Sequence, residues 1–201
     1  MRIPSSRWAK KLRLDQTKKH VSCANQRLDR EVDGGEASPT LLVYRLHPET
    51  KQLTKTSMNW GLIPHYLEER PDFQPLYAPT DILFRRRMFL EAYRKRRCIV
   101  PMKEFHQRDR LHKRRTIAHK EGRLLNFAGI WENWRAPGTG DWERTFAIVT
   151  VRSNGLIANT QHRMPLIIDE ANFNYWLDSE NDPRDLLTPS SEMCSMLIVL
   201  A

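Results

Sequence analysis

The feature of the sequence that most constrains its fold is a series of short apolar segments separated by proline, glycine and polar turn residues. Residues 146–151 are the clearest of these segments, because they are rich in β-branched side chains that favour strands. Residues 41–46 and 53–60 predict a hairpin. Further strands are expected at 98–100, where Pro101 ends the segment, and at 127–131 and 196–200.

Two segments differ from this pattern and predict helices. Residues 82–96 carry apolar groups at helical spacing, with Arg85, Arg86, Arg87, Arg94 and Lys95 expected to face solvent. Asp169 is a candidate N-cap for a short helix that ends at Leu177. The sequence therefore predicts an α+β fold, with a curved, barrel-like, mostly antiparallel sheet and two or three flanking helices.

The length of 201 residues and the 40% hydrophobic content fit one domain with a real core. No Gly/Ser-rich or Pro-rich linker divides the chain. Residues 1–36 are polar and charged without a convincing apolar face, so we expect a loosely ordered N-terminal segment there. Residues 37–201 would then form the folded domain.

The formal net charge is +9, and the sequence pI is about 9.7. Part of this charge lies in three clusters, at 85–87, 94–97 and 108–115. Clustered lysine and arginine predict a polyanionic partner such as nucleic acid. The alternative is a solvated basic surface that keeps the protein soluble.

The chain contains three cysteines, Cys23, Cys98 and Cys194, without paired spacing. Neither a disulfide framework nor a thiolate zinc site is expected, and a reducing cytosolic location fits best. The histidines are too irregularly spaced for one helical face and no HExxH pattern is present, so we expect neither a metal nor a cofactor. The sequence also has no signal-peptide pattern and no apolar run of membrane-spanning length.

Four sequence segments occur together and in order. They are WGLIP at 60–64, RRCIVPM at 96–102 preceded by MFLEAY, FAGIWE at 127–132 followed by TFAIVT, and RMPLII at 163–168. These segments resemble the signatures of the abasic-site processing family, also called SOS response-associated peptidases. The resemblance covers roughly residues 37 to 190.

The resemblance implies a function in the DNA damage response. Proteins of this family bind single-stranded DNA that carries an abasic site. The cysteine that follows the initiator Met attacks the sugar aldehyde with its α-amine and its thiol, and a thiazolidine ring closes. The same cysteine supports self-removal of a leader peptide in some members. A carboxylate and an imidazole would move the protons, and a side-chain amide would orient the aldehyde.

This sequence departs from the family pattern at each of those positions. Arg2 follows Met1, and Cys23 would act only after proteolysis. Tyr77 falls at the position of the orienting amide, and Gln107 falls at the position of the catalytic glutamate. Gln107 keeps the shape of that glutamate, but its amide cannot exchange a proton near neutral pH.

The catalytic histidine of the family aligns with Gln161, and His162 lies one place further along the chain. In an extended segment that shift turns a side chain to the opposite face. His162 is nevertheless the candidate that could rescue the role, since some relatives vary the spacing before Arg-Met-Pro. Pro79 and Asp81 also replace a DNA-contacting arginine and a glutamate of the family pattern.

The expected DNA contacts follow from the resemblance and from the basic clusters. They comprise two aromatic residues that could stack on bases and four arginines, namely Tyr66, Phe105, Arg87, Arg96, Arg97 and Arg163. Trp131 could also stack on a base, but a place in the core is favoured.

Three hypotheses follow. The chain is a sensor that crosslinks itself to abasic sites, or a pseudoenzyme that keeps a groove for single-stranded DNA, or a decayed prophage or genomic remnant. The missing catalytic groups favour the second or the third. Relatives continue beyond the equivalent of Ala201, so the sequence predicts a truncated C-terminus and an uncovered sheet edge. The protein is expected to act as a cytoplasmic, nucleoid-associated monomer.

Overall fold

The computed structural model describes residues 27–28, 39–108, 113–153, 162–189 and 197–200. The strands are β1 (Arg27–Leu28), β2 (Thr40–Leu46), β3 (Leu53–Trp60), β4 (Tyr77–Pro79), β5 (Arg97–Met102), β6 (Glu104–Arg108), β7 (Arg114–His119), β8 (Leu125–Arg135), β9 (Trp142–Arg152), β10 (Arg163–Pro165) and β11 (Leu197–Leu200). The helices are α2 (Thr80–Leu83), α3 (Arg87–Lys95) and α5 (Phe173–Leu177), with 3-10 turns η3 (Glu170–Asn172) and η4 (Arg184–Leu186).

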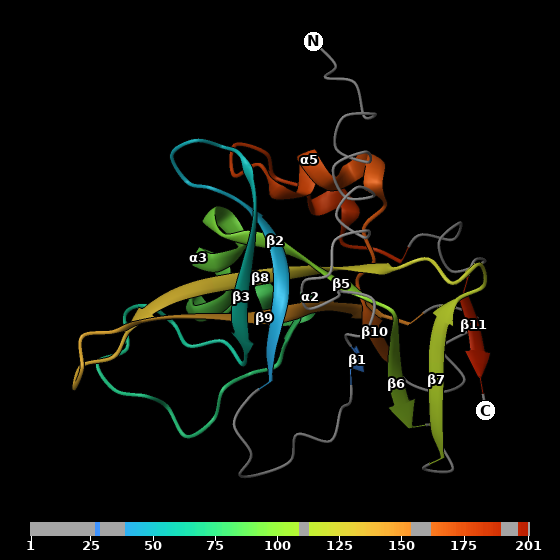
Figure 1. The fold of residues 1–201 in the computed structure, drawn as a ribbon, viewed down its shortest axis with the longest axis horizontal. Coiled ribbons are helices and arrows are strands. Elements are labelled where there is room, and N and C mark those ends of the chain that lie inside the picture. The colour runs from blue at the N-terminus through green and yellow to red at the C-terminus, as the bar shows by residue number, and fades with distance from the viewer. Residues whose placement is uncertain (1–26, 29–38, 109–112, 154–161, 190–196, 201) are drawn as a thin grey trace.

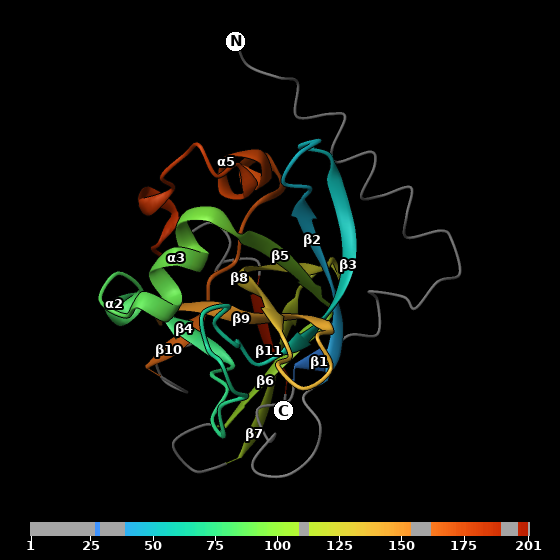
Figure 2. The same cartoon turned by 90° about the vertical axis from the view of Figure 1, so that its left-hand side faces the viewer.

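Five strands close into a barrel in the order β9-β3-β2-β5-β8, because β8 also pairs with β9. The predicted hairpin is confirmed, since β2 and β3 pair antiparallel from Thr40↔Asn59 to Leu46↔Leu53. β4 and β10 extend the sheet beside β9. Figures 1 and 2 show α2 and α3 on one side of this barrel and α5 above β5, to which Trp176 of α5 donates a hydrogen bond. The α+β, barrel-like prediction is therefore confirmed.

A second sheet of four strands, in the order β1-β6-β7-β11, stands beside the barrel. The final strand predicted at 196–200 is confirmed as β11, which pairs antiparallel with β7. β1 lies within the segment expected to be loosely ordered and pairs parallel with β6. The rest of that segment, residues 1–26 and 29–36, lies outside the described residues.

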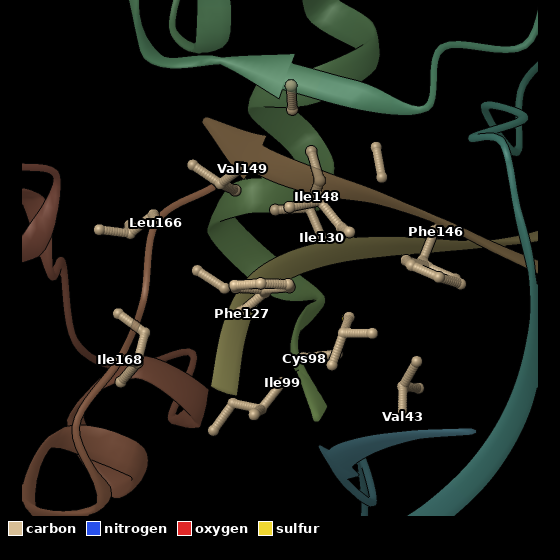
Figure 3. Close-up of a cluster of buried hydrophobic side chains, with 14 of the residues drawn as sticks. Val43, Cys98, Ile99, Phe127, Ile130, Phe146, Ile148, Val149, Leu166 and Ile168 are labelled. Carbon is tan, nitrogen blue, oxygen red and sulfur yellow. The ribbon is translucent and has the colours of Figure 1, made fainter. Parts of the chain in front are cut away.

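The barrel interior is filled by side chains that alternate along the strands. Figure 3 shows Val43, Cys98 and Phe146, from β2, β5 and β9, gathered around one interior space. Gly129 of β8 lies at a close approach there, since a Cβ atom at this position would stand 2.7 Å from the Cys98 Sγ. Trp131 is buried, as favoured from the sequence.

The helix predicted over residues 82–96 is wrong in its continuity. α2 ends at Leu83 and α3 begins at Arg87, because Arg86 is extended with φ −101° and ψ 120°. Phe89, Ala92 and Tyr93 are the buried face of α3, while Arg85, Arg86, Arg94 and Lys95 are exposed as predicted. The apolar spacing predicted which residues of the segment are buried, but it does not indicate that the chain bends between two short helices.

Two further boundaries differ from expectation. Pro101 does not end its strand, because it lies within β5 and is a register partner of Asn126 in β8. Asp169 precedes the turn η3 and makes no side-chain capping hydrogen bond, and α5 begins only at Phe173. The predicted end of this helix at Leu177 is confirmed.

Candidate functional site

Thr150 of β9 is the point where two sequence-predicted segments meet. Pro79 of β4 is its parallel register partner, and Pro165 of β10 is its antiparallel one. The two segments therefore flank the same part of β9, although they lie far apart in the sequence. This pairing places Tyr77 and Arg163 on the two strands that flank β9.

Arg163 holds this junction together, because all three nitrogens of its guanidinium have partners there. Its Nε donates to the Thr150 hydroxyl at 3.1 Å, and its Nη2 donates to the Thr150 carbonyl at 2.6 Å and to the Thr80 hydroxyl at 3.2 Å. Its Nη1 forms an ion pair with Asp81 at the start of α2. Arg163 thus ties β10 to β9 and α2, and it would contact a ligand only by sharing or exchanging these partners.

The other predicted catalytic positions are not all gathered at this junction. The Tyr77 ring packs edge-on against Trp60 with a centroid distance of 5.5 Å. His162 is exposed, and its carbonyl accepts a hydrogen bond from the Ser153 N–H at 2.9 Å. Gln107 belongs to β6 in the second sheet, opposite Arg115. Gln161 lies outside the described residues.

A network that the sequence analysis missed surrounds the carboxylate of Glu132. This residue in β8 is only 1% exposed. One carboxylate oxygen accepts from Arg96 Nη2 at 2.7 Å, and the other lies 3.1 Å from His65 Nδ1. Burial of an acid is tolerated when it is paired and hydrogen-bonded in this way. The signal was present in the sequence, since His65 follows WGLIP directly and Glu132 ends FAGIWE.

The network continues to the surface through α3. The second ring nitrogen of His65 lies 3.6 Å from Glu91, and Arg87 Nε donates to Glu91 at 2.9 Å. The hydrogen bond between Arg87 and Glu91 raises the pKa of Arg87 and lowers the pKa of Glu91. The Arg87 guanidinium stands 4.3 Å from the ring centroid of Tyr66, which is 36% exposed. Tyr66 is thus an exposed aromatic ring held beside a cation.

Two of the residues predicted to contact DNA are inside the protein, which corrects that expectation. Phe105 is buried edge-on against Phe127 with centroids 5.4 Å apart. Arg97 is buried and donates to the carbonyls of Tyr93 at 2.7 Å and Asn181 at 2.9 Å. Burial lowers the pKa of Arg97. Phe105 belongs to the hydrophobic core, and Arg97 ties β5 to α3 and to the segment after α5 through these hydrogen bonds, so neither side chain faces solvent.

Four exposed cations beside α3 make no side-chain hydrogen bond or ion pair among the described residues. They are Arg85 and Arg86 before the helix, and Arg94 and Lys95 in its last turn. In contrast, Arg96 forms an ion pair with Glu132 through its Nη2, and Arg87 forms one with Glu91. The third predicted basic cluster lies partly outside the described residues, at 109–112.

The part of the chain that the structure describes offers no metal site, no membrane-spanning helix and no exposed cysteine. No group of three or more His, Cys, Asp or Glu side chains there could hold a metal ion. No helix within the described ranges is long and apolar enough to span a membrane. Cys98 is buried, and burial raises the pKa of its thiol. Cys23 and Cys194 lie outside the described residues.

The closed barrel with its flanking short helices and the ordered motifs define the class of protein. A family model described as SOS response associated peptidase (SRAP) matches residues 5–199. The chain belongs to this family, as the resemblance of its motifs predicted.

Individual relatives agree with this assignment. The chain is 28% identical over 174 residues to the abasic site processing protein YoqW of Bacillus subtilis, covering 80% of this chain and 76% of the relative. It is 26% identical over 182 residues to the abasic site processing protein HMCES of Pongo abelii, covering 71% of this chain and 51% of that protein. It therefore spans about half the length of the latter.

Solved structures share the fold. A protein of Bacteroides thetaiotaomicron superposes with a TM-score of 0.69 at 27% identity, covering 80% of this chain and 72% of that chain. A protein of Bordetella bronchiseptica gives a TM-score of 0.70 at 21% identity, covering 84% of this chain and 89% of that chain. The second likeness concerns the fold alone.

Proposed function

We propose that this chain binds single-stranded DNA, including strands with abasic sites, and that it does not complete the covalent crosslink. The observation that carries the binding is a set of exposed cations around α3 that have no ion-pair partner among the described residues, in a chain whose relatives are named abasic site processing proteins. A non-catalytic binding module is the form of the family function that its residues support.

The arrangement of these cations suits a phosphate backbone. Arg85 and Arg86 precede α3, and Arg94 and Lys95 end it. A helix of nine residues is about 13 Å long, so the two pairs are separated rather than stacked on one spot. Separated cations can neutralise successive phosphates, and no carboxylate in the described ranges competes for these four.

An aromatic ring from the segment after β3 lies against the start of the same helix. Tyr66 lies over Arg87, the first residue of α3, and remains partly exposed. Unpaired bases stack on exposed aromatic rings, and this stacking tolerates any base. The ring would therefore hold a base while the cations hold the backbone. The ion pairs of His65 with Glu91 and Glu132 hold this arrangement in place, since they join α3 and β8 to the residue before Tyr66.

Impaired chemistry follows from the residues at three positions. Tyr77 packs on Trp60, so its ring does not offer the amide that the family resemblance requires there. Gln107 and Gln161 cannot exchange protons near neutral pH. Loss of a general acid or base costs roughly two to four orders of magnitude in rate. His162 is exposed and remains the one candidate for a rescuing imidazole.

The binding proposal is tested by a salt titration with a fluorescent single-stranded oligonucleotide that carries one abasic site. The Arg85→Gln/Arg86→Gln variant should bind more weakly. Its slope of log affinity against log salt should be less negative by about 1.4, which corresponds to two lost phosphate contacts on a single strand. Lys103→Gln/Arg123→Gln removes two exposed cations from turns elsewhere and should keep the parent slope. Equal slopes in both variants and the parent would remove α3 from the interface.

The proposal of impaired chemistry is tested by denaturing electrophoresis after incubation with the abasic oligonucleotide, without a reducing trap. The chain with Arg2 should give no heat-stable shifted band, because Met1 offers an amine without a thiol. The Arg2→Cys variant should restore little, and adding Gln107→Glu and Gln161→His should restore more. A strong shifted band from the unaltered chain would show that the chemistry is intact.

A further inference from the structure

At the end of the barrel where the β2–β3 and β8–β9 hairpins lie, an arginine is buried that has no acidic partner in the described part of the chain. Arg45 of β2 is only 6% exposed. Its Nε donates to the Thr56 hydroxyl at 3.2 Å, and its Nη1 donates to the Leu46 carbonyl at 3.3 Å. Its guanidinium stands 4.8 Å from the ring centroid of Trp131. Within the described residues, no carboxylate forms an ion pair with it.

The charge of Arg45 is therefore not balanced by a carboxylate, and a second arginine adds to it. Burial lowers the pKa of Arg45, and the nearby charge of Arg144 lowers it further. Arg144 is exposed and, among the described residues, forms no ion pair. Arginine stays protonated at physiological pH, so Arg45 and Arg144 are two like charges that repel each other. An anion at this point would relieve both the repulsion and the cost of burial.

Arg45 also keeps donors that an anion could use. Its second terminal nitrogen, Nη2, donates no hydrogen bond within the described ranges. The side-chain oxygen of Asn133, the register partner of Arg144, is enclosed without a partner in the described part. Turning this amide over would present N–H donors in its place.

The strand register puts an exposed aromatic ring on the same face. Trp142 and Arg144 lie two residues apart on β9, and Trp131 and Asn133 are related in the same way on β8. Trp142 is 62% exposed. Arg135, its register partner, holds the ring with its guanidinium 5.8 Å from the ring centroid and its Nε bonded to the Gly140 carbonyl. The nearby carboxylates are Glu143, which faces Arg70 and Asn59, and Asp141 in the turn.

This face is distant from the junction at Thr150. Thr150 and Arg144 are six residues apart on β9, which corresponds to about 20 Å along a strand. β4 and β10 flank the Thr150 end, whereas Arg144 lies next to the β8–β9 hairpin. A ligand bound by Arg45 and Arg144 would therefore occupy a separate site, whether or not α3 binds DNA.

We propose that the hairpin end of the barrel binds the phosphate group of a nucleotide, with Arg45 and Arg144 on the phosphate and Trp142 stacked on the base. Guanidinium groups match phosphate oxygens in geometry and charge, and an exposed indole stacks on any base. The nucleotide could be free or part of a single strand, since both present the same groups to the site.

The test is isothermal titration calorimetry at low salt, with thymidine 5′-monophosphate and inorganic phosphate as probes. The parent should bind the nucleotide more tightly than phosphate. Arg144→Gln should weaken both by about tenfold, as expected for one charge-assisted hydrogen bond. Trp142→Ala should weaken the nucleotide to the level of phosphate and leave phosphate unchanged. Arg45→Met should abolish both while melting no lower than the parent, because an apolar side chain replaces an unbalanced buried charge.

The matched control is Arg152→Gln, which removes an exposed arginine from the other end of β9 and should bind both probes as the parent does. Unchanged affinities in Arg144→Gln, or an equal loss in Arg152→Gln, would overturn the site. A labelled short oligothymidylate distinguishes the source. If Arg144→Gln weakens it in parallel with the nucleotide, the site serves a strand, and if only the nucleotide weakens, it serves a free nucleotide. The Arg85→Gln/Arg86→Gln variant should bind the nucleotide as the parent does. A failure of the proposal that α3 binds DNA can therefore be distinguished from a failure of the nucleotide site.

Discussion

The residue that best illustrates how this chain places charge is Glu132. Its carboxylate is buried beneath the junction of β8, α3 and the segment after β3, where Arg96 and His65 satisfy it. The same ion pair explains why Arg96, expected on the DNA-facing surface, is partly withdrawn from it. A basic residue next to a motif is thus not automatically available to a ligand.

Replacing Glu132 with glutamine should destabilise the protein. The change leaves the Arg96 guanidinium facing a neutral amide, and breaking a buried pair costs about 3–5 kcal/mol when both partners are fully enclosed. Arg96 retains some access to water, so we expect a loss of roughly 2 kcal/mol in the free energy of unfolding. Urea denaturation measures it. Glu121→Gln, which breaks the exposed pair with Arg123, should cost less than about 1 kcal/mol. Similar losses in the two variants would contradict the role of burial.

Cys98 should be chemically inert in the folded protein. Burial raises the pKa of its thiol, so the reactive thiolate is scarce, and reagents cannot reach it. In a Cys23→Ser/Cys194→Ser variant, a thiol reagent should therefore react only after urea is added. Because the folded thiol holds its proton above its ordinary pKa, stability should also fall as pH rises beyond about 8.5, the unfolded value. Rapid labelling without denaturant would contradict the buried placement.

At the scale of elements, β9 organises the molecule. It pairs with β3, β4, β8 and β10, so it joins the barrel to the strands that carry Tyr77 and Arg163. β8 accompanies it along the whole hairpin and then packs its Gly129 against β5. The absence of a side chain at Gly129 is what lets these strands approach Cys98.

Adding one methyl group at this contact should be costly. In Gly129→Ala the new Cβ atom meets the Cys98 Sγ at 2.7 Å and the Val100 side chain at 3.3 Å. Overpacking of this kind typically costs about 1–3 kcal/mol. Combining it with Cys98→Ala should recover part of the loss, and urea denaturation of all four proteins of the cycle measures the coupling. Gly138→Ala, whose Cβ meets nothing within 4 Å, is the control. Strict additivity would show that the two residues do not clash.

At the scale of the whole molecule, two sheets share one core. Leu197 of β11 and Phe105 of β6 are buried with residues of the barrel, including Phe127. β11 also covers the edge of β7, where it pairs from Leu197↔His119 to Leu200↔Thr116. The second sheet is therefore part of the cooperative unit rather than an appendage.

Deleting residues 197–201 should destabilise the protein and promote association. The deletion removes the buried Leu197 side chain, worth about 2–5 kcal/mol by analogy with large-to-small core changes, and leaves β7 as an unpaired edge. Size-exclusion chromatography and thermal melting measure both effects. Removal of Ala201 alone should change neither. A truncated protein that elutes as the parent does and keeps the parent melting temperature would contradict this account.

The candidate site was predicted less completely than the fold. Short β-branched segments such as 146–151 are local signals, and the strand order follows from their pairing. The roles of Phe105 and Arg97 were wrong, because their burial depends on partners distant in sequence, such as Phe127 and the carbonyl of Asn181. Gln107 and Gln161 stay predictions, as does the role of His162.

The sequence by itself determined the family and the α+β barrel. Ordered motifs and alternating apolar strands are patterns of residues that are close in the sequence, so they can be recognised without the tertiary structure. Only the tertiary structure decided which charges are free. Arg163 is tied to Asp81, Glu132 is enclosed by Arg96 and His65, and Arg45 is buried without an acid among the described residues. Ion pairing and burial depend on distances in space, which the order of residues along the chain does not fix.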